Sequence, residues 1–395
     1  GNYAFYDCSS LTSIEIPSSV TSIGNVAFGR CSGLTSITIP DNVTSIGRYA
    51  FQNCTGLTSI TIPKSVTSIG EFAFYSCTGL TSITIPKSVT SIGRSAFSGC
   101  DNLTVYLEGG STLTSESFGE VANKVVTRWN EGDLTWTLDA EGTMTISGTG
   151  AMMDYDTDDS PATKKKDSVK KVVIQEGVTS IGAYAFFDCR KLASIEIPSS
   201  VTSIGNGAFY NCTGLTSINI PESVTSIGIY AFVWCGGLTS INIPKSVTSI
   251  REGTFKGCTS LTNINIPESV TNIGDDAFQD CNSLTDINIP ESVTSIGGNA
   301  FSGTPWLTNK QQDNPFVIVN GILIDGTTCS GEVTIPDGVT SIGDSAFQNC
   351  TDLTSIVIPE GVKSIGNFAF YNCTGLTSIT IPKSVISIGR NAFNG

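Results

Sequence analysis

The sequence predicts a β-rich solenoid of the α/β class, in which coils of 23 residues stack on one another. The period is the first observation behind this prediction: within each run of repeats, every cysteine except Cys329 recurs at that interval. Prolines and phenylalanines follow the same interval. The second observation is that a single unit is too small to bury its own apolar residues. Stacked units cover one another, so a run of them can form one continuous core.

The long strand of each coil is predicted from alternating apolar and polar residues. In residues 34–39, Ile37 and Ile39 are expected to face inward, while Thr38 between them faces outward. Pro40 has no N–H group to donate to a neighbouring strand, so we expect the strand to end there.

The rest of the coil is predicted to turn twice. Val43 and Ile46 anchor a second, shorter extended piece, and Gly47 then permits a sharp change of direction. Phe51 and Cys54 belong to an A-F-x-x-C segment whose spacing is that of a helix, which predicts one short helical turn with its apolar side inward.

The repeat resembles a known family. Leu34, Ile37 and Ile39 match the L-x-x-L-x-L core of leucine-rich repeats, while the P-x-S-V-T-S-I-G and A-F-x-x-C segments resemble the BspA-like class of that family. The resemblance covers most of the chain. It implies a right-handed leucine-rich-repeat solenoid. It also implies a secreted or cell-surface protein of host-associated bacteria, with some members adhering to host or bacterial partners.

The repeat period breaks twice, and the breaks suggest the domain organisation. We expect a first repeat array at 1–103, an inserted β-hairpin module at 104–171 and a second array at 172–395. Within the second array, an enlarged coil at about 304–335 carries an Asn320-Gly321 hairpin turn. Neither end shows a polar cap, so we expect the natural protein to continue on both sides, with any export signal and anchor outside this stretch.

Composition excludes several functions. The chain has 21 Lys and Arg against 35 Asp and Glu, a net charge of −14, which argues against binding nucleic acid. It has no histidine, which excludes a Ser–His–Asp nucleophile and a His-ligated zinc. No apolar run is long enough for direct membrane insertion. We therefore expect no catalytic residue, no metal site and no cofactor.

The cysteines that recur every 23 residues stack in a column from coil to coil. Three interpretations are open: disulfide bonds, metal ligation, or burial as small apolar side chains. No C-x-x-C spacing is present, and stacked coils bring thiols within disulfide reach only if their Cα atoms lie about 4.4–6.8 Å apart. We therefore favour a buried structural column. Its members, with two phenylalanines of the neighbouring column, are Cys31, Cys54, Cys77, Cys212, Cys235, Cys258, Phe51 and Phe232.

An acidic run suggests a second metal candidate. Asp154, Asp156 and Asp158 have the spacing that begins a calcium loop, but Asp159 and Lys165 stand where that loop needs Gly and Glu. The sequence favours a solvated acidic loop, with the lysines that follow it as its partners.

The polar residues that face outward at one position of each long strand form a column, and this column is the candidate binding surface. A stacked amide column could hydrogen-bond along itself, or the column could present a flat polar face to a protein or glycan on a host or neighbouring bacterial surface. An ice-binding face is disfavoured by the amide and Glu substitutions. The candidate residues are Thr38, Thr61, Thr84, Asn219, Asn242, Asn265 and Asn288. Exposed aromatic residues flank the edge that carries the predicted helical turn, at Tyr49, Phe72, Tyr184, Tyr210, Tyr230, Trp234 and Tyr371.

These features predict a non-catalytic surface or secreted protein that binds macromolecules. The alternative is a passive structural stalk that presents a distal domain, which the uniformity of the coils favours. An adhesin should carry a face whose residues change along the chain, and the change from Thr to Asn is the one systematic change found.

Overall fold

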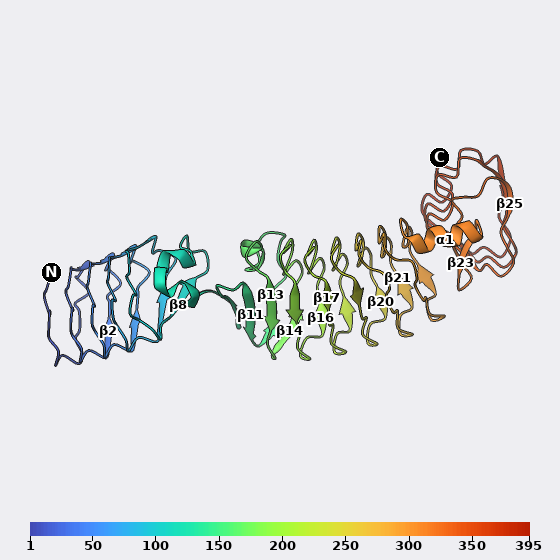
Figure 1. Ribbon diagram of the computed structural model, residues 1–395. Coiled ribbons are helices and arrows are strands. Elements are labelled where there is room, and N and C mark those ends of the chain that lie inside the picture. Colours follow the sequence, from blue (N-terminus) through green and yellow to red (C-terminus); the bar gives the residue numbers. More distant parts are fainter. The chain divides into compact units, whose positions relative to one another are not determined.

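The structure, a computed structural model, describes residues 1–395, with the backbone alone at position 122, and divides into two compact units, Gly1–Ile146 and Ser147–Gly395. Each unit is a stack of coils of about 23 residues with few helices (Figure 1). The predicted leucine-rich-repeat solenoid is therefore confirmed. The division at Ile146 falls inside the stretch 104–171, so a separate inserted module remains a prediction.

Two sheets line the coils of the first unit, and the strands contributed by its repeats run parallel in both. Equivalent residues of successive coils pair, as Ser36 pairs with Ser59 and Ser45 with Ser68. The long-strand sheet contains β2 (Ser36–Thr38), β4 (Ser59–Thr61), β6 (Ser82–Ile85) and β8 (Thr104–Glu108), followed by β9 (Val125–Glu131), β10 (Leu134–Leu138) and β11 (Thr143–Gly148). The short-strand sheet contains β1 (Ser22–Ile23), β3 (Ser45–Ile46), β5 (Ser68–Ile69) and β7 (Ser91–Ile92).

The second unit repeats this arrangement. Its long strands are β13 (Lys171–Ile174), β15 (Ser194–Glu196), β17 (Ser217–Ile218), β19 (Ser240–Ile241), β25 (Gly331–Thr334), β27 (Leu353–Val357) and β29 (Ser378–Thr380). Its short strands are β12 (Gly150–Ala151), β14 (Val178–Ile181), β16 (Ser203–Ile204), β18 (Ser226–Ile227), β20 (Ser249–Ile250), β21 (Asn272–Ile273), β22 (Ser295–Ile296), β26 (Ser341–Ile342), β28 (Ser364–Ile365) and β30 (Ser387–Ile388). One-turn helix η2 (Thr163–Lys165) precedes β13.

The third side of each coil differs from the predicted helical turn. Tyr49 and Asn53 have φ of +56° and +55°, so the backbone alternates in handedness and forms successive turns. This alternation points every second N–H group at the next coil: Phe51 N–H donates to the Ala73 carbonyl at 2.7 Å. A helical turn would direct these groups back into its own coil. The A-F-x-x-C spacing places the same apolar residues inward in both conformations, so it could not distinguish them.

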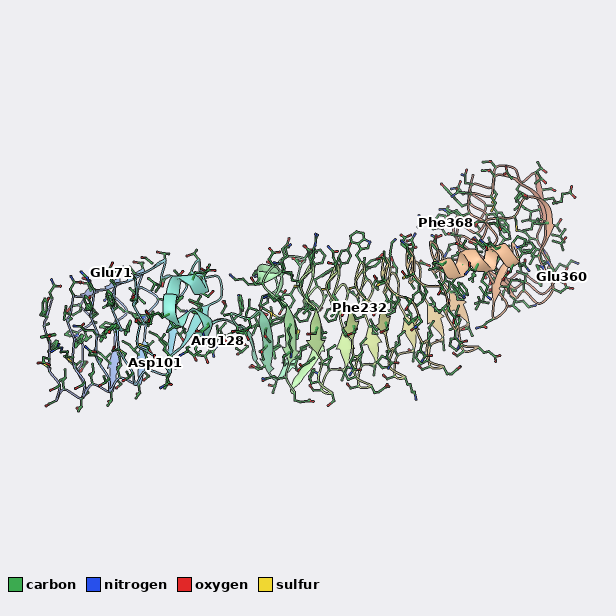
Figure 2. The ribbon with its side chains drawn as sticks, viewed as in Figure 1. Glu71, Asp101, Arg128, Phe232, Glu360 and Phe368 are labelled. Carbon is green, nitrogen blue, oxygen red and sulfur yellow. The ribbon has the colours of Figure 1, made fainter. Side chains whose placement is uncertain are left out.

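Phenylalanines and cysteines form two buried ladders inside the coils. Phe51 stacks between Phe28 and Phe74 at 5.3 Å from each, and Phe232 (Figure 2) is enclosed in the same way in the second unit. The Cys54 Sγ donates to the Phe28 carbonyl at 3.1 Å. Cys31, Cys77, Cys212, Cys235 and Cys258 make the same bond at 3.0–3.2 Å.

All thirteen cysteines, which lie within the described residues, are free thiols. The six cysteines of the predicted structural column are buried, and no disulfide joins them in the described residues. Burial raises the pKa of the Cys54 and Cys235 thiols to about 12, which keeps both protonated at neutral pH.

Helices cap the aromatic ladder at both breaks in the period. In the first unit, Phe118 of η1 (Ser115–Lys124) packs on Phe97 at 5.9 Å. In the second, Trp306 of α1 (Pro305–Asp313) lies 4.8 Å from Phe301. The Thr304 hydroxyl caps α1 by accepting the Leu307 N–H at 3.2 Å. The sequence does not predict α1, because the apolar residues of this helix show no helical periodicity over its nine positions.

Both predicted hairpins are present. The first hairpin, predicted from Leu134 to Ile146, is formed by β10 and β11, which are neighbours in one sheet, and the Asp139 N–H donates to the Thr143 carbonyl at 3.1 Å across its turn. β9 pairs antiparallel with the other side of β10. In the second, β23 (Val317–Val319) and β24 (Ile322–Asp325) pair antiparallel across Asn320 and Gly321. These two residues have φ of +51° and +76°, the positive values that an Asn-Gly hairpin turn requires.

Candidate functional site

The predicted threonine positions form one row on the long-strand sheet of the first unit. Thr38 pairs with Thr61, and Thr61 with Thr84, so their side chains stand at equivalent points of adjacent strands. All three are exposed, while Ile37 and Ile60 beside them are buried. The alternation predicted from the sequence places them outward. We call Thr38, Thr61 and Thr84 the threonine row.

The threonine row ends in a stacked tyrosine and arginine. The register continues from Thr84 to Tyr106 of β8, and from Glu108 to Arg128 of β9. The Arg128 guanidinium lies over the Tyr106 ring, 4.1 Å from its centroid. Figure 2 shows Arg128 near one end of the first unit, in the region where Figure 1 labels β8. This cation–π contact fixes the arginine at the end of the row.

A pocket of about 410 Å³ lies where the row meets Arg128. Its polar lining consists of Ser59, Thr61, Ser82, Thr84, Lys64, Glu108, Arg128 and Asn130. We call this the threonine-row pocket. Thr61 and Thr84 are among the residues predicted from the sequence, and Arg128 is not. β9 lies outside the repeat, so its register with β8 cannot be counted from the period.

The four predicted asparagines form the equivalent row in the second unit. Asn265 forms parallel backbone bridges with Asn242 and Asn288, and the side chains of all four, including Asn219, are exposed. In the part of the chain that the structure describes, none of these side chains has a hydrogen-bond partner. The amides therefore face solvent and do not bond along the column. We call these four residues the asparagine row.

The asparagine row also ends beside a pocket of about 490 Å³, which is lined in part by residues of α1. Its charged lining residues are Asp286, Lys310 and Asp313. The Asn320 side chain donates to the Pro290 and Val293 carbonyls at 2.8 and 2.9 Å, which fastens the β23–β24 hairpin to the preceding coil. Two carboxylates and one amine give this pocket the opposite charge balance to the threonine-row pocket.

The predicted exposed aromatics form short stacks. Tyr49 stacks on Phe72 at 4.9 Å in the first unit. In the second, Tyr210 packs against Phe187 and Trp234, each at 5.1 Å, and Trp234 is half-exposed. The remaining members are placed on the same edge: Tyr184 beside Phe187, Tyr230 hydrogen-bonded to Glu252, and Tyr371 beside Phe368. These rings pack mainly on one another along the stack.

The acidic run makes the contacts of a charged surface loop. The Asp154 carboxylate accepts the Ala183 N–H at 2.7 Å, while Asp158 and Asp159 lie 3.8 and 3.9 Å from lysine amines. These amines belong to the lysines that follow the run, as predicted. Among the described residues, no three His, Cys, Asp or Glu side chains are grouped so that they could hold a metal ion.

Comparison with known families gives one match. The pattern of the BspA type leucine rich repeat region matches in six copies, over residues 1–121, 161–258, 206–316 and 326–395. No curated protein sequence matches the chain.

Several solved structures are similar to this chain. A leucine-rich repeat protein from Bacteroides ovatus is 28% identical, and the match covers 97% of this chain and 82% of that protein, with a TM-score of 0.38. A leucine rich cell surface protein from Faecalibacterium prausnitzii is also 28% identical, with 87% of each chain covered and a TM-score of 0.35. A leucine-rich repeat protein from Eubacterium ventriosum is 24% identical over 67% of this chain and 93% of that one, with a TM-score of 0.33.

Proposed function

Because this chain belongs to the BspA-type leucine-rich repeat family, we propose that it is a bacterial cell-surface or secreted protein that binds a macromolecular partner and catalyses no reaction. The partner is a protein or glycan on a host or neighbouring bacterial surface. No described helix has the length and apolar character needed to cross a lipid bilayer.

The observation that carries the proposal is the asparagine row. Its four amides are exposed, evenly spaced and without partners in the described part of the chain, so each offers two donors and an acceptor. Asparagine is a poor strand residue, and its presence at successive strand positions costs stability. A binding role gives a reason for that cost.

The alternative function is a stalk. Strand pairing between coils is uniform, as Ser203 pairs with Ser226 and Ser217 with Ser240. Such uniformity suits a spacer that holds another domain at a distance. The two functions differ in one respect, since a stalk needs no exposed row of free amides.

A binding assay distinguishes them. The purified chain is applied to an array of extracellular-matrix proteins and glycans, beside a variant in which all four residues of the asparagine row are changed to Lys. The matched control places four lysines on exposed threonines of the short-strand side in the same coils: Thr225, Thr248, Thr271 and Thr294. We expect the native chain and the control to bind at least one member of the array that the asparagine-row variant no longer binds.

The other outcomes are equally informative. Equal binding by all three proteins would move the contact away from the asparagine row. Absence of binding by the native chain would favour the stalk.

A further inference from the structure

The threonine-row pocket contains an arginine without an anionic partner. A guanidinium offers five N–H donors, and the Arg128 Nε is buried without a hydrogen-bond partner in the described residues. The neighbouring carboxylate of Glu108 instead accepts the backbone N–H of Lys87 at 3.0 Å. The Nη groups of Arg128 are not among the buried unpartnered atoms and have no hydrogen-bond or ion-pair partner in the described residues, so they are the donors that a ligand in the pocket can reach.

The charges of the threonine-row pocket favour an anion. Lys64 and Arg128 form no ion pair within the described residues, and Glu108 is the one carboxylate among the lining residues. The pocket is therefore positive in a chain whose net charge is −14. This contrast gives charge complementarity for a carboxylate, which guanidinium binds through two parallel hydrogen bonds.

The hydroxyl groups of the pocket favour a saccharide. Ser59, Thr61, Ser82 and Thr84 stand on adjacent strands, which are spaced about 4.8 Å apart, and their hydroxyls have no partner in the described residues. Each hydroxyl can both donate and accept, as sugar hydroxyls do. The volume lies within the range of roughly 300–1,000 Å³ of small-molecule sites.

We propose that the threonine-row pocket binds an acidic saccharide, with Arg128 pairing the sugar carboxylate and the row of hydroxyls bonding the sugar ring. This inference rests on the proposed function, since it names the chemistry of one partner and places its contact on the first unit. An acidic protein side chain would supply the carboxylate alone. The pocket at the end of the asparagine row, with two carboxylates, is not expected to bind such a ligand.

The test is isothermal titration of the full chain with three probes. Sialyllactose and a hyaluronan tetrasaccharide carry a sialic acid and a uronic acid respectively, and lactose is the neutral control. We expect at least one acidic probe to bind and lactose to bind at least tenfold more weakly. The two acidic probes distinguish the two classes of sugar acid.

Three variants locate the contact. Arg128→Gln is expected to weaken binding of the acidic probe at least tenfold. Arg94→Gln, which makes the same charge change at an exposed arginine outside the pocket, is expected to leave it unchanged. Thr84→Val removes one hydroxyl without a change of charge or strand propensity, and is expected to weaken binding severalfold. Thermal unfolding of each variant checks that the fold is retained.

Several results would overturn the inference. One is equal binding of lactose and the acidic probes. Another is a hexaglutamate peptide that binds as tightly as the sugars with no effect of Thr84→Val, since the site would then recognise an acidic protein. Absence of binding by both acidic probes also overturns it. In that case, array binding that depends on the asparagine row would still support the proposed function.

Discussion

The threonine row of the first unit and the asparagine row of the second occupy the same position of the coil, yet they offer different chemistry. Both rows are exposed and in register, and both end beside a pocket at a break in the period. Arg128 from the non-repeat strand β9 makes one pocket positive, while Asp286 and Asp313 make the other negative. The repeat thus sets where a row lies, and the breaks decide the charge at its end.

The largest expected effect tests whether the cores of the two units are packed equally well. Phe51→Ala and Phe232→Ala each remove a fully buried ring stacked on both sides, so each is expected to cost about 3–5 kcal/mol of unfolding free energy. Chemical denaturation measures both. Tyr75→Ala, at a partly exposed ring, is the control and should cost much less. If one phenylalanine variant lost less than half as much unfolding free energy as the other, the two cores would be packed differently.

The second prediction concerns alkaline pH. Burial raises the pKa of Cys54 and Cys235 from 9.0 to about 12, so the folded chain holds these protons more tightly than the unfolded chain. Stability is therefore fully present below pH 9 and is lost as pH rises from about 9 to about 12. Each such thiol removes up to about 1.4 kcal/mol per pH unit in that window.

Denaturation curves at successive pH values check the loss in both units. Alkylation at pH 8 gives an independent measurement, in which exposed Cys8 should react and the buried column should not. Rapid alkylation of Cys235 in the folded chain would contradict the buried ladder.

The third prediction exchanges the rows. Asn242→Thr should stabilise the second unit by about 0.5–1 kcal/mol, and Thr61→Asn should destabilise the first by a similar amount, because threonine suits a strand better than asparagine. Denaturation curves of the two variants and the native chain provide the measurement. Destabilisation by Asn242→Thr would show that the amides hold the coils together, and would weaken the case for a binding row.

The smallest effects are expected at ion pairs between coils. Arg48 lies 3.3 Å from Glu71, which is labelled in Figure 2. Both side chains are half-exposed, so Glu71→Gln should cost less than about 1 kcal/mol. Lys256 and Asp276 lie 2.8 Å apart and are less exposed, so Asp276→Asn should cost more than Glu71→Gln. Raising the salt concentration should reduce both differences. Equal costs for the two variants would show that burial of the pair is unimportant here.

The period predicted most of the coil but not the ends of the rows. Constant spacing fixes the register of Thr38, Thr61 and Thr84, and it places Phe51 and Cys54 in buried ladders. It could not place Arg128, whose contact with Tyr106 depends on how a strand outside the repeat pairs with β8. The period also did not predict the positive φ values on the third side of the coil. Non-glycine residues such as Tyr49 adopt them because hydrogen bonds to the next coil compensate for the strain.

The constant register has a genetic consequence. Because each residue pairs with its equivalent 23 positions along, deletion of residues 219–241 would join Ile218 to Asn242 and leave every kind of pairing unchanged. Duplication of one coil would do the same. Recombination between the near-identical coding units of neighbouring coils can therefore lengthen or shorten the solenoid by whole coils. Each product would still fold. Natural variants of this chain should therefore differ in the number of coils more readily than in the length of a coil.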